Sequence, residues 1–275
     1  MRILIIGCGY VGLPLGQALA DLGHEVHGIR RSKFFAEGIT THTLDITQHG
    51  ALNELPDTFD WVINTVSSSR GDLEGHRSVF VDGTRHLLDW LVEPSTHLIL
   101  ISSTSVYNQL DGSWVDEQSV TTPSGGTGVH LLEAEEMLLA APQPATILRV
   151  AGIYGPERGF LFRQFMKGET GSFDDGNRWL NMIHRDDVIS AIMIALRLVP
   201  SVYNVADDKP VTQHFFLEWL ANRLSKPPMA PKGARFPRKR TVTNKRVLNT
   251  KLKTAGWALS FPTFREGYEE LIREG

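Results

Sequence analysis

The first two thirds of the chain alternate short apolar runs with segments of helical periodicity, and this alternation restricts the fold more than any other feature. The apolar runs have the character of strands that are buried on both faces. They are Ile3–Ile6, Glu25–Ile29, Thr41–Leu44, Trp61–Val66, Leu98–Ser102, Thr146–Val150 and, later, Val202–Val205. The helical segments between them are Leu13–Leu22, Arg77–Val92, Val129–Ala140 and Asp187–Leu198. Because such alternation requires crossovers between parallel strands, we predict an α/β fold with a Rossmann-like, doubly wound parallel sheet.

Composition and charge argue against several classes of protein. The 28 Lys and Arg residues nearly balance the 31 Asp and Glu residues, and the net charge of −3 gives no field that would recruit nucleic acid. No apolar run approaches the ~18 residues that a membrane span needs, so we expect no membrane partner. The chain opens directly into a strand, without the layout of a signal peptide, and its single cysteine, Cys8, cannot form a disulfide within the chain. These features predict a cytoplasmic protein without a metal site.

A glycine-rich motif, Gly7–Gly12 with the sequence GCGYVG, follows the first strand and opens the first helix. In this context a Gly-x-Gly-x-x-Gly pattern predicts dinucleotide binding rather than an ordinary turn. We expect Gly7 to allow the tight turn, Gly9 to let a pyrophosphate approach the backbone, and Gly12 to let the helix pack closely on the sheet. The N–H groups at the positive end of the helix would then hold the diphosphate.

The end of the second strand discriminates between the two nicotinamide dinucleotides. A protein that prefers NAD usually carries an Asp or Glu about 20 residues after the motif, where the carboxylate accepts the ribose 2′-hydroxyl. Here the strand Glu25–Ile29 is followed by Arg30, Arg31 and Ser32, with no acid. Two guanidiniums and a hydroxyl suit a 2′-phosphate, which a carboxylate would repel. We predict NADP(H) as the cofactor, with NAD(H) as the alternative; the other interpretation of the pattern is an ordinary surface arginine pair.

Several further segments, taken in order, resemble those of the NAD(P)-dependent epimerase/dehydratase family, the extended and atypical short-chain dehydrogenases/reductases. They are Leu44–Ile46, Val62–Val66, Val81–Leu88, Ile101–Tyr107, Arg149–Pro156, Ile183–Asp187 and Tyr203–Val205. The likeness runs through nearly the whole chain. It implies a dinucleotide-binding domain of residues 1–155, to which residues 183–205 return, and a small C-terminal substrate domain of residues 156–182 and 206–275.

The resemblance also implies further contacts with the cofactor. Asp45 matches an Asp that contacts the adenine amino group, and Val62–Val66 matches a strand that runs along the cofactor. Motif, arginine pair and resemblance together predict the cofactor-binding residues Gly7, Gly9, Tyr10, Val11, Gly12, Arg30, Arg31, Ser32, Asp45, Ile46, Thr65, Val66 and Ser102.

The catalytic pair of this family is missing from the chain. The family uses a Tyr four residues before a Lys, with a Ser or Thr nearby, and the phenol moves a proton while hydride passes to or from the nicotinamide. The resemblance places Ser103 at the Ser position, Thr127 at the Tyr position and Leu131 at the Lys position. We therefore expect an atypical proton relay, with Ser103 and Thr127 as its candidate residues.

Two other groups could replace the missing phenol. Tyr154 and Arg158 imitate the spacing of the pair, but they lie in a loop rich in Gly and Pro. His130 titrates in the useful range, although a helical His is more often a polar surface residue.

Three segments allow both a functional and a structural interpretation. Residues 226–253 carry ten Lys and Arg and no Asp or Glu, which suits either a solvated surface or the wall of a pocket for a phosphate-bearing ligand. The loop Ser67–Gly71 follows a strand and would contact substrate or nicotinamide, or be a flexible loop. Asp174–Asn177 predicts a hairpin turn rather than a calcium site, because further acids are lacking.

Two functions from different classes account for these features. The first is an NADP-dependent oxidoreductase or epimerase/dehydratase that acts, as a monomer or homodimer, on a small or sugar-like substrate with or without a phosphate group. The second is a catalytically silent NADP(H)-binding sensor or scaffold, which the missing Tyr and Lys favour. Cofactor binding is common to both, so only turnover separates them.

Overall fold

The computed structural model describes residues 1–56, 58–67, 72–168, 177–227 and 243–274. The chain forms two compact units. The first unit comprises residues 1–106, 125–149 and 192–203, and the second comprises residues 107–124, 150–191 and 204–275. Within the ranges described, no helix is both long and apolar enough to cross a membrane.

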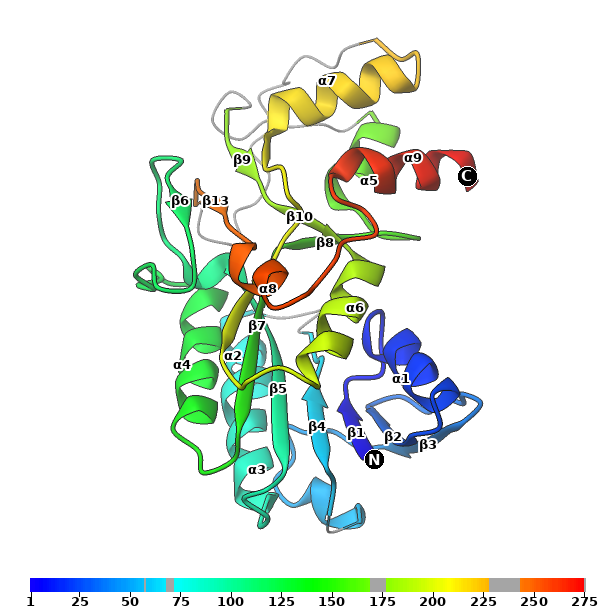
Figure 1. The fold of residues 1–275 in the computed structure, drawn as a ribbon, viewed down its shortest axis with the longest axis vertical. Helices are drawn as coiled ribbons and strands as arrows, with labels where there is room; N and C mark the ends of the chain where they lie inside the picture. The colour runs from blue at the N-terminus through cyan, green and yellow to red at the C-terminus, as the bar shows by residue number, and fades with distance from the viewer. Residues whose placement is uncertain (57, 68–71, 169–176, 228–242, 275) are drawn as a thin grey trace. The chain divides into compact units, whose positions relative to one another are not determined.

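A seven-stranded sheet forms the centre of the first unit, in the order β11-β7-β5-β4-β1-β2-β3 (Figure 1). Its strands are β1 Arg2–Ile6, β2 Glu25–Arg30, β3 Ile39–Thr43, β4 Trp61–Asn64, β5 His97–Ser103, β7 Ala145–Val150 and β11 Val202–Val205. The neighbours β1–β2, β2–β3, β1–β4 and β4–β5 are parallel. Most of the strand residues are buried, as expected for a sheet that is covered on both faces.

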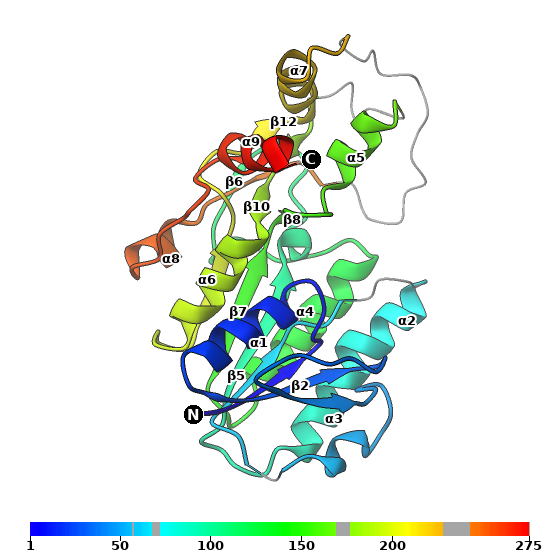
Figure 2. The same cartoon turned by 90° about the vertical axis from the view of Figure 1, so that its right-hand side faces the viewer.

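Helices lie on both faces of this sheet. They are α1 Gly12–Asp21, α2 Leu73–Arg77, α3 Gly83–Trp90 and α4 Thr127–Leu139, with the short helical turns η1 Ala51–Glu54, η2 Ser78–Asp82 and η3 Thr104–Val106. Figure 2 shows α1 on one face and α2, α3 and α4 on the other. The prediction of a Rossmann-like, doubly wound α/β fold is therefore confirmed.

The helix predicted over 77–92 has a different form in the structure. It begins earlier, at Leu73, because Asp72 caps it: the Asp72 carboxylate accepts the Gly75 N–H at 3.0 Å. The chain then passes through a π-helical turn, η2, before α3 begins at Gly83. A Cβ at Gly83 would lie 3.2 Å from the Ile46 side chain, so a small residue suits this position.

The second unit is built from short strands and helices. Its strands are β6 Trp114–Val115, β8 Gly152–Tyr154, β9 Trp179–Leu180, β10 Met182–His184, β12 Val211–Thr212 and β13 Arg246–Val247. They form three two-stranded ladders, of which β8–β10 and β6–β13 are parallel and β9–β12 is antiparallel. Its helices are α5 Phe160–Met166, α7 Gln213–Arg223, α8 Thr250–Thr254 and α9 Phe264–Glu274, and α6 Arg185–Ala195 contains residues of both units.

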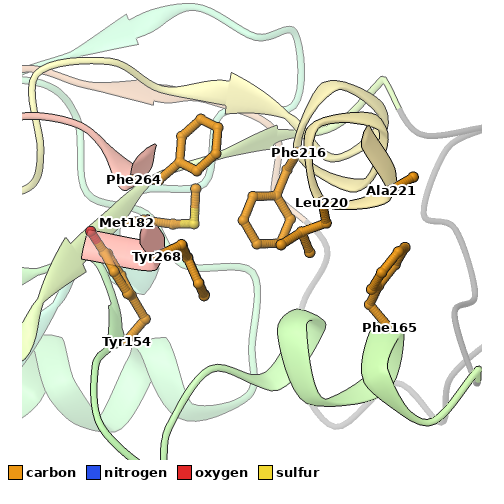
Figure 3. Close-up of a cluster of buried hydrophobic side chains, with 8 residues drawn as sticks. All are labelled: Tyr154, Phe165, Met182, Phe216, Leu220, Ala221, Phe264 and Tyr268. Atoms are coloured by element: carbon orange, nitrogen blue, oxygen red, sulfur yellow. The ribbon is translucent and has the colours of Figure 1, made fainter. Parts of the chain in front are cut away.

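A largely aromatic cluster forms a core of the second unit (Figure 3). Its members are Tyr154, Phe165, Met182, Phe216, Leu220, Ala221, Phe264 and Tyr268. The rings of Tyr154 and Tyr268 stack with their centroids 4.5 Å apart. Two backbone N–H groups, of Ser260 and Phe261, donate to the buried carboxylate of Asp187 at 2.7 and 3.0 Å, which ties the segment before α9 to α6.

Several segments singled out from the sequence lie outside the described residues. These are residues 68–71 of the loop after β4, residues 174–176 of the predicted hairpin turn, and residues 228–242 of the basic segment.

We predict that Gly267→Ala destabilises the second unit. A Cβ at Gly267 would lie 2.6 Å from Cε2 and 2.8 Å from Cζ of Tyr154, whose ring is held by the stack with Tyr268. Overpacking of this kind costs about 1–3 kcal/mol, more than the ~1 kcal/mol that Ala gains over Gly in a helix. Urea denaturation should show a lower midpoint for Gly267→Ala. Adding Tyr154→Phe should partly restore it, because this removes the Tyr154 hydroxyl, which has no hydrogen-bond partner among the described residues. The exposed Glu270→Ala on the same helix serves as the control, and an unchanged midpoint for Gly267→Ala would contradict the packing argument.

Candidate functional site

The turn after β1 is attached to the end of β2 through two backbone hydrogen bonds. The N–H groups of Gly7 and Cys8 both donate to the carbonyl of Ile29, at 3.0 and 2.9 Å. Gly7 has a φ of +98°, and a Cβ there would lie 2.8 Å from the backbone nitrogen of Val66. Both the backbone conformation and the close approach therefore require glycine at position 7.

Gly12 is required by the close packing of α1 on this turn. A Cβ at Gly12 would lie 2.5 Å from both the Gly7 carbonyl oxygen and Thr65 Oγ1. The Thr65 hydroxyl donates to the Gly7 carbonyl at 2.8 Å, which connects the turn to the end of β4. The predicted cofactor residues Thr65 and Val66 thus lie against the glycine motif, as the order β4-β1-β2 dictates.

Gly9 differs from the other two glycines of the motif. It is exposed, and a Cβ there would meet nothing closer than the Gly7 carbonyl oxygen at 3.9 Å. Its φ lies outside the left-handed region. Nothing in the described part of the chain requires glycine at this position.

The amino end of α1 has no capping side chain. Its N-cap residue is Val11, and no acidic residue lies in the first turn. The partial positive charge that a helix carries at this end is therefore not offset by a capping side chain or a first-turn acid of the helix itself. Tyr10 and Val11 lie in the turn between Gly9 and this helix end, with Tyr10 partly exposed and Val11 buried.

The remaining residue of the motif, Cys8, contributes to packing. Its thiol is buried, and burial raises its pKa to about 12. A Cβ at Gly28 would lie 2.6 Å from Cys8 Sγ, so the thiol fills the space beside β2. A thiol with this pKa is not a nucleophile at neutral pH.

The residues at the end of β2 are exposed and unpaired. Arg30, Arg31 and Ser32 are all exposed, and within the ranges that the structure describes neither guanidinium forms an ion pair. Arg30 is the last residue of β2 and pairs with Thr43 of β3. The two cations are therefore available to an anionic ligand at this edge.

Asp45 and Ile46 follow β3 directly. The Asp45 carboxylate accepts hydrogen bonds from the Thr47 N–H at 3.0 Å and from the Thr47 hydroxyl at 2.9 Å, which orient it. Ile46 is buried, and its carbonyl accepts from His86 Nδ1 at 3.0 Å, if that nitrogen carries the proton.

A buried charged network lies beneath the end of β5. The Ser102 hydroxyl donates to the carboxylate of Glu135, which is 1% exposed and lies on α4. The Arg149 guanidinium grips the same carboxylate, with Nε and Nη2 at 3.0 and 2.7 Å from Oε2. The hydroxyl of Ser102, a residue predicted to contact the cofactor, is therefore hydrogen-bonded within the protein. The Glu135 carboxylate on α4 connects that helix to β5 and β7.

The candidate catalytic positions lie on neighbouring elements. Ser103 is the last residue of β5 and its Oγ accepts the Ser105 N–H at 3.2 Å, while Thr127 is the first residue of α4, which packs on β5. Leu131, at the position of the missing Lys, is 4% exposed and part of the core.

His130 and Tyr154, the two groups that could replace the missing phenol, lie in environments different from those of Ser103 and Thr127. His130 Nδ1 lies 3.3 Å from Nδ1 of His76 on α2, so its ring joins two helices. Tyr154 is buried in the second unit, and burial together with the nearby Asp207 raises its pKa. A phenol in that environment is unsuited to the acid–base role that Tyr154 and Arg158 would share.

The burial of three charged residues, Arg149, Glu135 and Lys245, was not predicted from the sequence. Arg149 stands in the apolar run Thr146–Val150, and a cation within a buried strand is a signal that a partner carboxylate must exist elsewhere. Glu135 gave no such signal, because helix α4 carries several acids. Lys245 of the second unit is also buried, and its position within the basic segment of residues 226–253 gave no sign of this.

We predict that the Glu135–Arg149 pair contributes strongly to stability and that its two members are coupled. Glu135→Leu removes the carboxylate that the buried Arg149 guanidinium contacts, and we expect it to lower the free energy of unfolding by about 3–5 kcal/mol. The double variant Glu135→Leu/Arg149→Met should lose less than the sum of the losses of the two single variants. Urea denaturation of the four proteins measures this cycle. Glu269→Leu, which breaks the exposed pair with Arg223, is the matched control and should cost at most about 1 kcal/mol. Additive single losses would contradict the coupling.

Comparisons with known proteins place these features in context. The model of the NAD dependent epimerase/dehydratase family matches residues 3–206. Protein YeeZ of Escherichia coli K12 is 27% identical over 263 residues, which are 90% of this chain and 93% of YeeZ. A solved structure from Methylobacillus flagellatus, provisionally assigned as an NAD-dependent epimerase/dehydratase, is 33% identical, with a TM-score of 0.81 over 99% of this chain and 98% of that one.

Proteins of much lower sequence identity share this fold. UDP-glucuronic acid 4-epimerase from Bacillus cereus, solved in complex with NAD, is 20% identical, with a TM-score of 0.81 over 100% of this chain and 99% of that one. At this identity the likeness concerns the fold alone.

Proposed function

The chain belongs to the NAD dependent epimerase/dehydratase family, and we propose that it binds NADP(H) and carries out hydride chemistry on a small, sugar-like substrate. When bound, the nicotinamide supplies or accepts the hydride. The protein's own residues bind the dinucleotide, orient the substrate and move the accompanying proton.

The glycine motif supports the binding of a dinucleotide. Gly7 and Gly12 are required by the packing of the protein itself, whereas Gly9 is not. Close approach of a diphosphate to the backbone accounts for glycine at position 9. The uncapped amino end of α1 offers the positive potential that such an anion needs.

The residues at the end of β2 support the proposed preference for NADP(H). The exposed side chains of Arg30, Arg31 and Ser32 suit a 2′-phosphate, and no carboxylate there would accept a 2′-hydroxyl in its place. Asp45, Ile46 and the β4 end at Thr65 and Val66 complete the proposed contacts with the cofactor.

We predict that Arg30→Asp weakens NADPH binding more than NADH binding. Replacing a guanidinium by a carboxylate removes charge-assisted hydrogen bonds to the 2′-phosphate, a loss of about ten-fold or more in affinity. Calorimetric titration of the wild-type and variant proteins with both cofactors measures the difference. Arg197→Asp makes the same charge change at an exposed arginine that lies elsewhere in the first unit, and it should leave both affinities unchanged. Tighter binding of NADH by the wild type would refute the preference.

The three glycines give a second, independent prediction. Gly9→Ala should leave the melting temperature of the cofactor-free protein unchanged, since its Cβ meets open space, and should weaken NADPH binding. Gly12→Ala should lower the melting temperature itself, because its Cβ would clash with the Gly7 carbonyl and Thr65. Thermal unfolding with and without NADPH separates the two effects. Equal loss of stability in both cofactor-free variants would show that Gly9 has a structural role after all.

The proton relay must work without a phenol or an ammonium at the usual positions. The Ser103 hydroxyl accepts one backbone N–H and retains its own proton for donation. Thr127 offers a second hydroxyl at the start of α4, but an aliphatic hydroxyl has too high a pKa to exchange a proton by itself. We propose that these two hydroxyls orient the reacting oxygen and that the substrate or solvent completes the transfer.

One observation favours a second function. Leu131, where the family places the Lys that binds the nicotinamide ribose, is buried in the core and cannot hold a hydroxyl. This suits an NADP(H)-binding sensor or scaffold without turnover. Nucleotide sugars are the first substrates to screen, because the Bacillus cereus relative in fold is an epimerase of UDP-glucuronic acid. Turnover that Ser103→Ala abolishes supports the enzyme, and binding of NADPH with no substrate consumed supports the sensor.

A further inference from the structure

Two histidines connect β2 and β3, the last two strands in the order of the seven-stranded sheet. His27 of β2 pairs with Thr40 of β3, and His42 lies two residues after Thr40, so both imidazoles are on the same face of the sheet. His27 Nδ1 lies 3.0 Å from His42 Nε2. The two strands are therefore joined by a hydrogen bond between side chains, in addition to the bonds of the backbone.

The neighbours of this pair limit how many protons it can hold. His27 Nε2 lies 3.2 Å from Glu25 Oε1, and because an ionised carboxylate only accepts, this nitrogen carries a hydrogen. The bond between the two rings forms whenever one of the two facing nitrogens carries a hydrogen and the other does not. This holds with no extra proton on the pair and with one. With two extra protons both facing nitrogens are donors and both rings are cations, so the bond is lost.

Charged groups from three elements lie next to the pair. The Glu25 carboxylate of β2 also accepts from Nε of Arg2, in β1, at 2.9 Å. Glu54 of η1 acts on His42 through its charge. Burial and the neighbouring His27 lower the pKa of His42, and Glu54 offsets this only in part. The second proton is therefore disfavoured at neutral pH, where the bond between the strands is formed.

The segment before β4 and the helix α3 contribute aromatic rings. Phe59 meets the His27 ring edge-on with its centroid 5.2 Å away, and Trp90 of α3 lies against Phe59 at 6.1 Å. The adjacent Asp60 carboxylate accepts the backbone N–H of Arg2 at 2.7 Å. His27 is 6% exposed under this cover. A second positive charge beside it would have little water to stabilise it.

The pair lies just before the strand ends that the proposed function uses. His27 is three residues before Arg30, and His42 is three residues before Asp45. At the ends themselves, the Leu44 N–H donates to the Arg30 carbonyl at 3.2 Å. Because β3 is the edge strand of the described sheet, its attachment to β2 sets the position of Asp45 relative to Arg30.

We propose that His27 and His42 are positioning residues for the adenosine half of the cofactor site, and that a second proton on the pair loosens β3 and weakens dinucleotide binding. The inference rests on the proposed function for the identity of the ligand. It adds a regulator of that site, the proton.

Calorimetric titration of the full chain with NADP⁺ at pH 7.5 and pH 5.5 tests the coupling. We expect acidification to weaken binding about five-fold or more further in the wild type than in His42→Gln, whose neutral amide cannot take up the second proton. The 2′-phosphate also titrates in this range, but it does so equally for every protein compared. His214→Gln removes an exposed histidine of α7 and is the matched control, which should follow the wild type.

Urea unfolding of the cofactor-free proteins gives a readout that needs no cofactor. Above about pH 6.5, His42 is neutral in the folded and the unfolded chain. Below that pH the unfolded chain binds a proton that the folded protein resists, so the free energy of unfolding falls as the pH falls. We expect the urea midpoint to fall further between pH 7.5 and pH 5.5 in the wild type and His214→Gln than in His42→Gln.

NMR of the histidine ring nitrogens in the wild type requires no substitution, and it decides the question if His42→Gln does not fold. The His27 and His42 rings should share a hydrogen bond at pH 7.5 and lose it as the affinity for NADP⁺ falls. Rings that remain bonded to each other at a pH where the affinity has already fallen would contradict the positioning role.

The outcomes separate this inference from the proposed function. Equal acid sensitivity of NADP⁺ binding in the wild type and in His42→Gln would overturn the positioning role and leave the cofactor proposal intact. Absence of NADP⁺ binding at pH 7.5 would overturn the proposed function and the positioning role together. The acid-sensitive bond between β2 and β3 would then be judged by the unfolding curves, and equal falls in the midpoint would overturn it as well.

Discussion

No side chain fits between the turn after β1 and the start of α1, and the position of that helix depends on this constraint. The Gly7 carbonyl, the Thr65 hydroxyl and the backbone at Val66 occupy the space that Cβ atoms at Gly7 and Gly12 would take. The turn is simultaneously bonded to Ile29 at the end of β2. The carboxyl ends of three strands are thereby gathered around the amino end of one helix, which is where doubly wound folds bind their ligands.

Two buried charges, one in each unit, have different kinds of partner. In the first, the Arg149 guanidinium and the Glu135 carboxylate satisfy each other and bring β7, α4 and β5 together. In the second, the Lys245 ammonium has only neutral acceptors. A matched pair contributes to a defined fold, whereas an unmatched charge opposes folding.

In the proposed reaction centre, the positions that the resemblance assigns to the family's Tyr and Lys hold Thr127 and Leu131. Leu131 is packed in the core, and Ser103 and Thr127 retain only hydroxyls. Position 131 therefore contributes packing energy where the family uses a cation. Such a site can still orient a substrate, but the proton must then come from the substrate or from solvent.

Local sequence determined the strand–helix alternation and the glycine turn, because each depends on residues that are close in the chain. Helix α2 begins at Leu73 rather than at the predicted Arg77, because the Asp72 carboxylate caps it and a cap decides a helix end more strongly than apolar periodicity does. Only the tertiary structure decided which charges are buried and what they meet. Arg149 and Glu135 are 14 residues apart, and Lys245 reaches Tyr107 across 138 residues. Burial and partnership of charges arise from packing between distant segments, which no local pattern encodes.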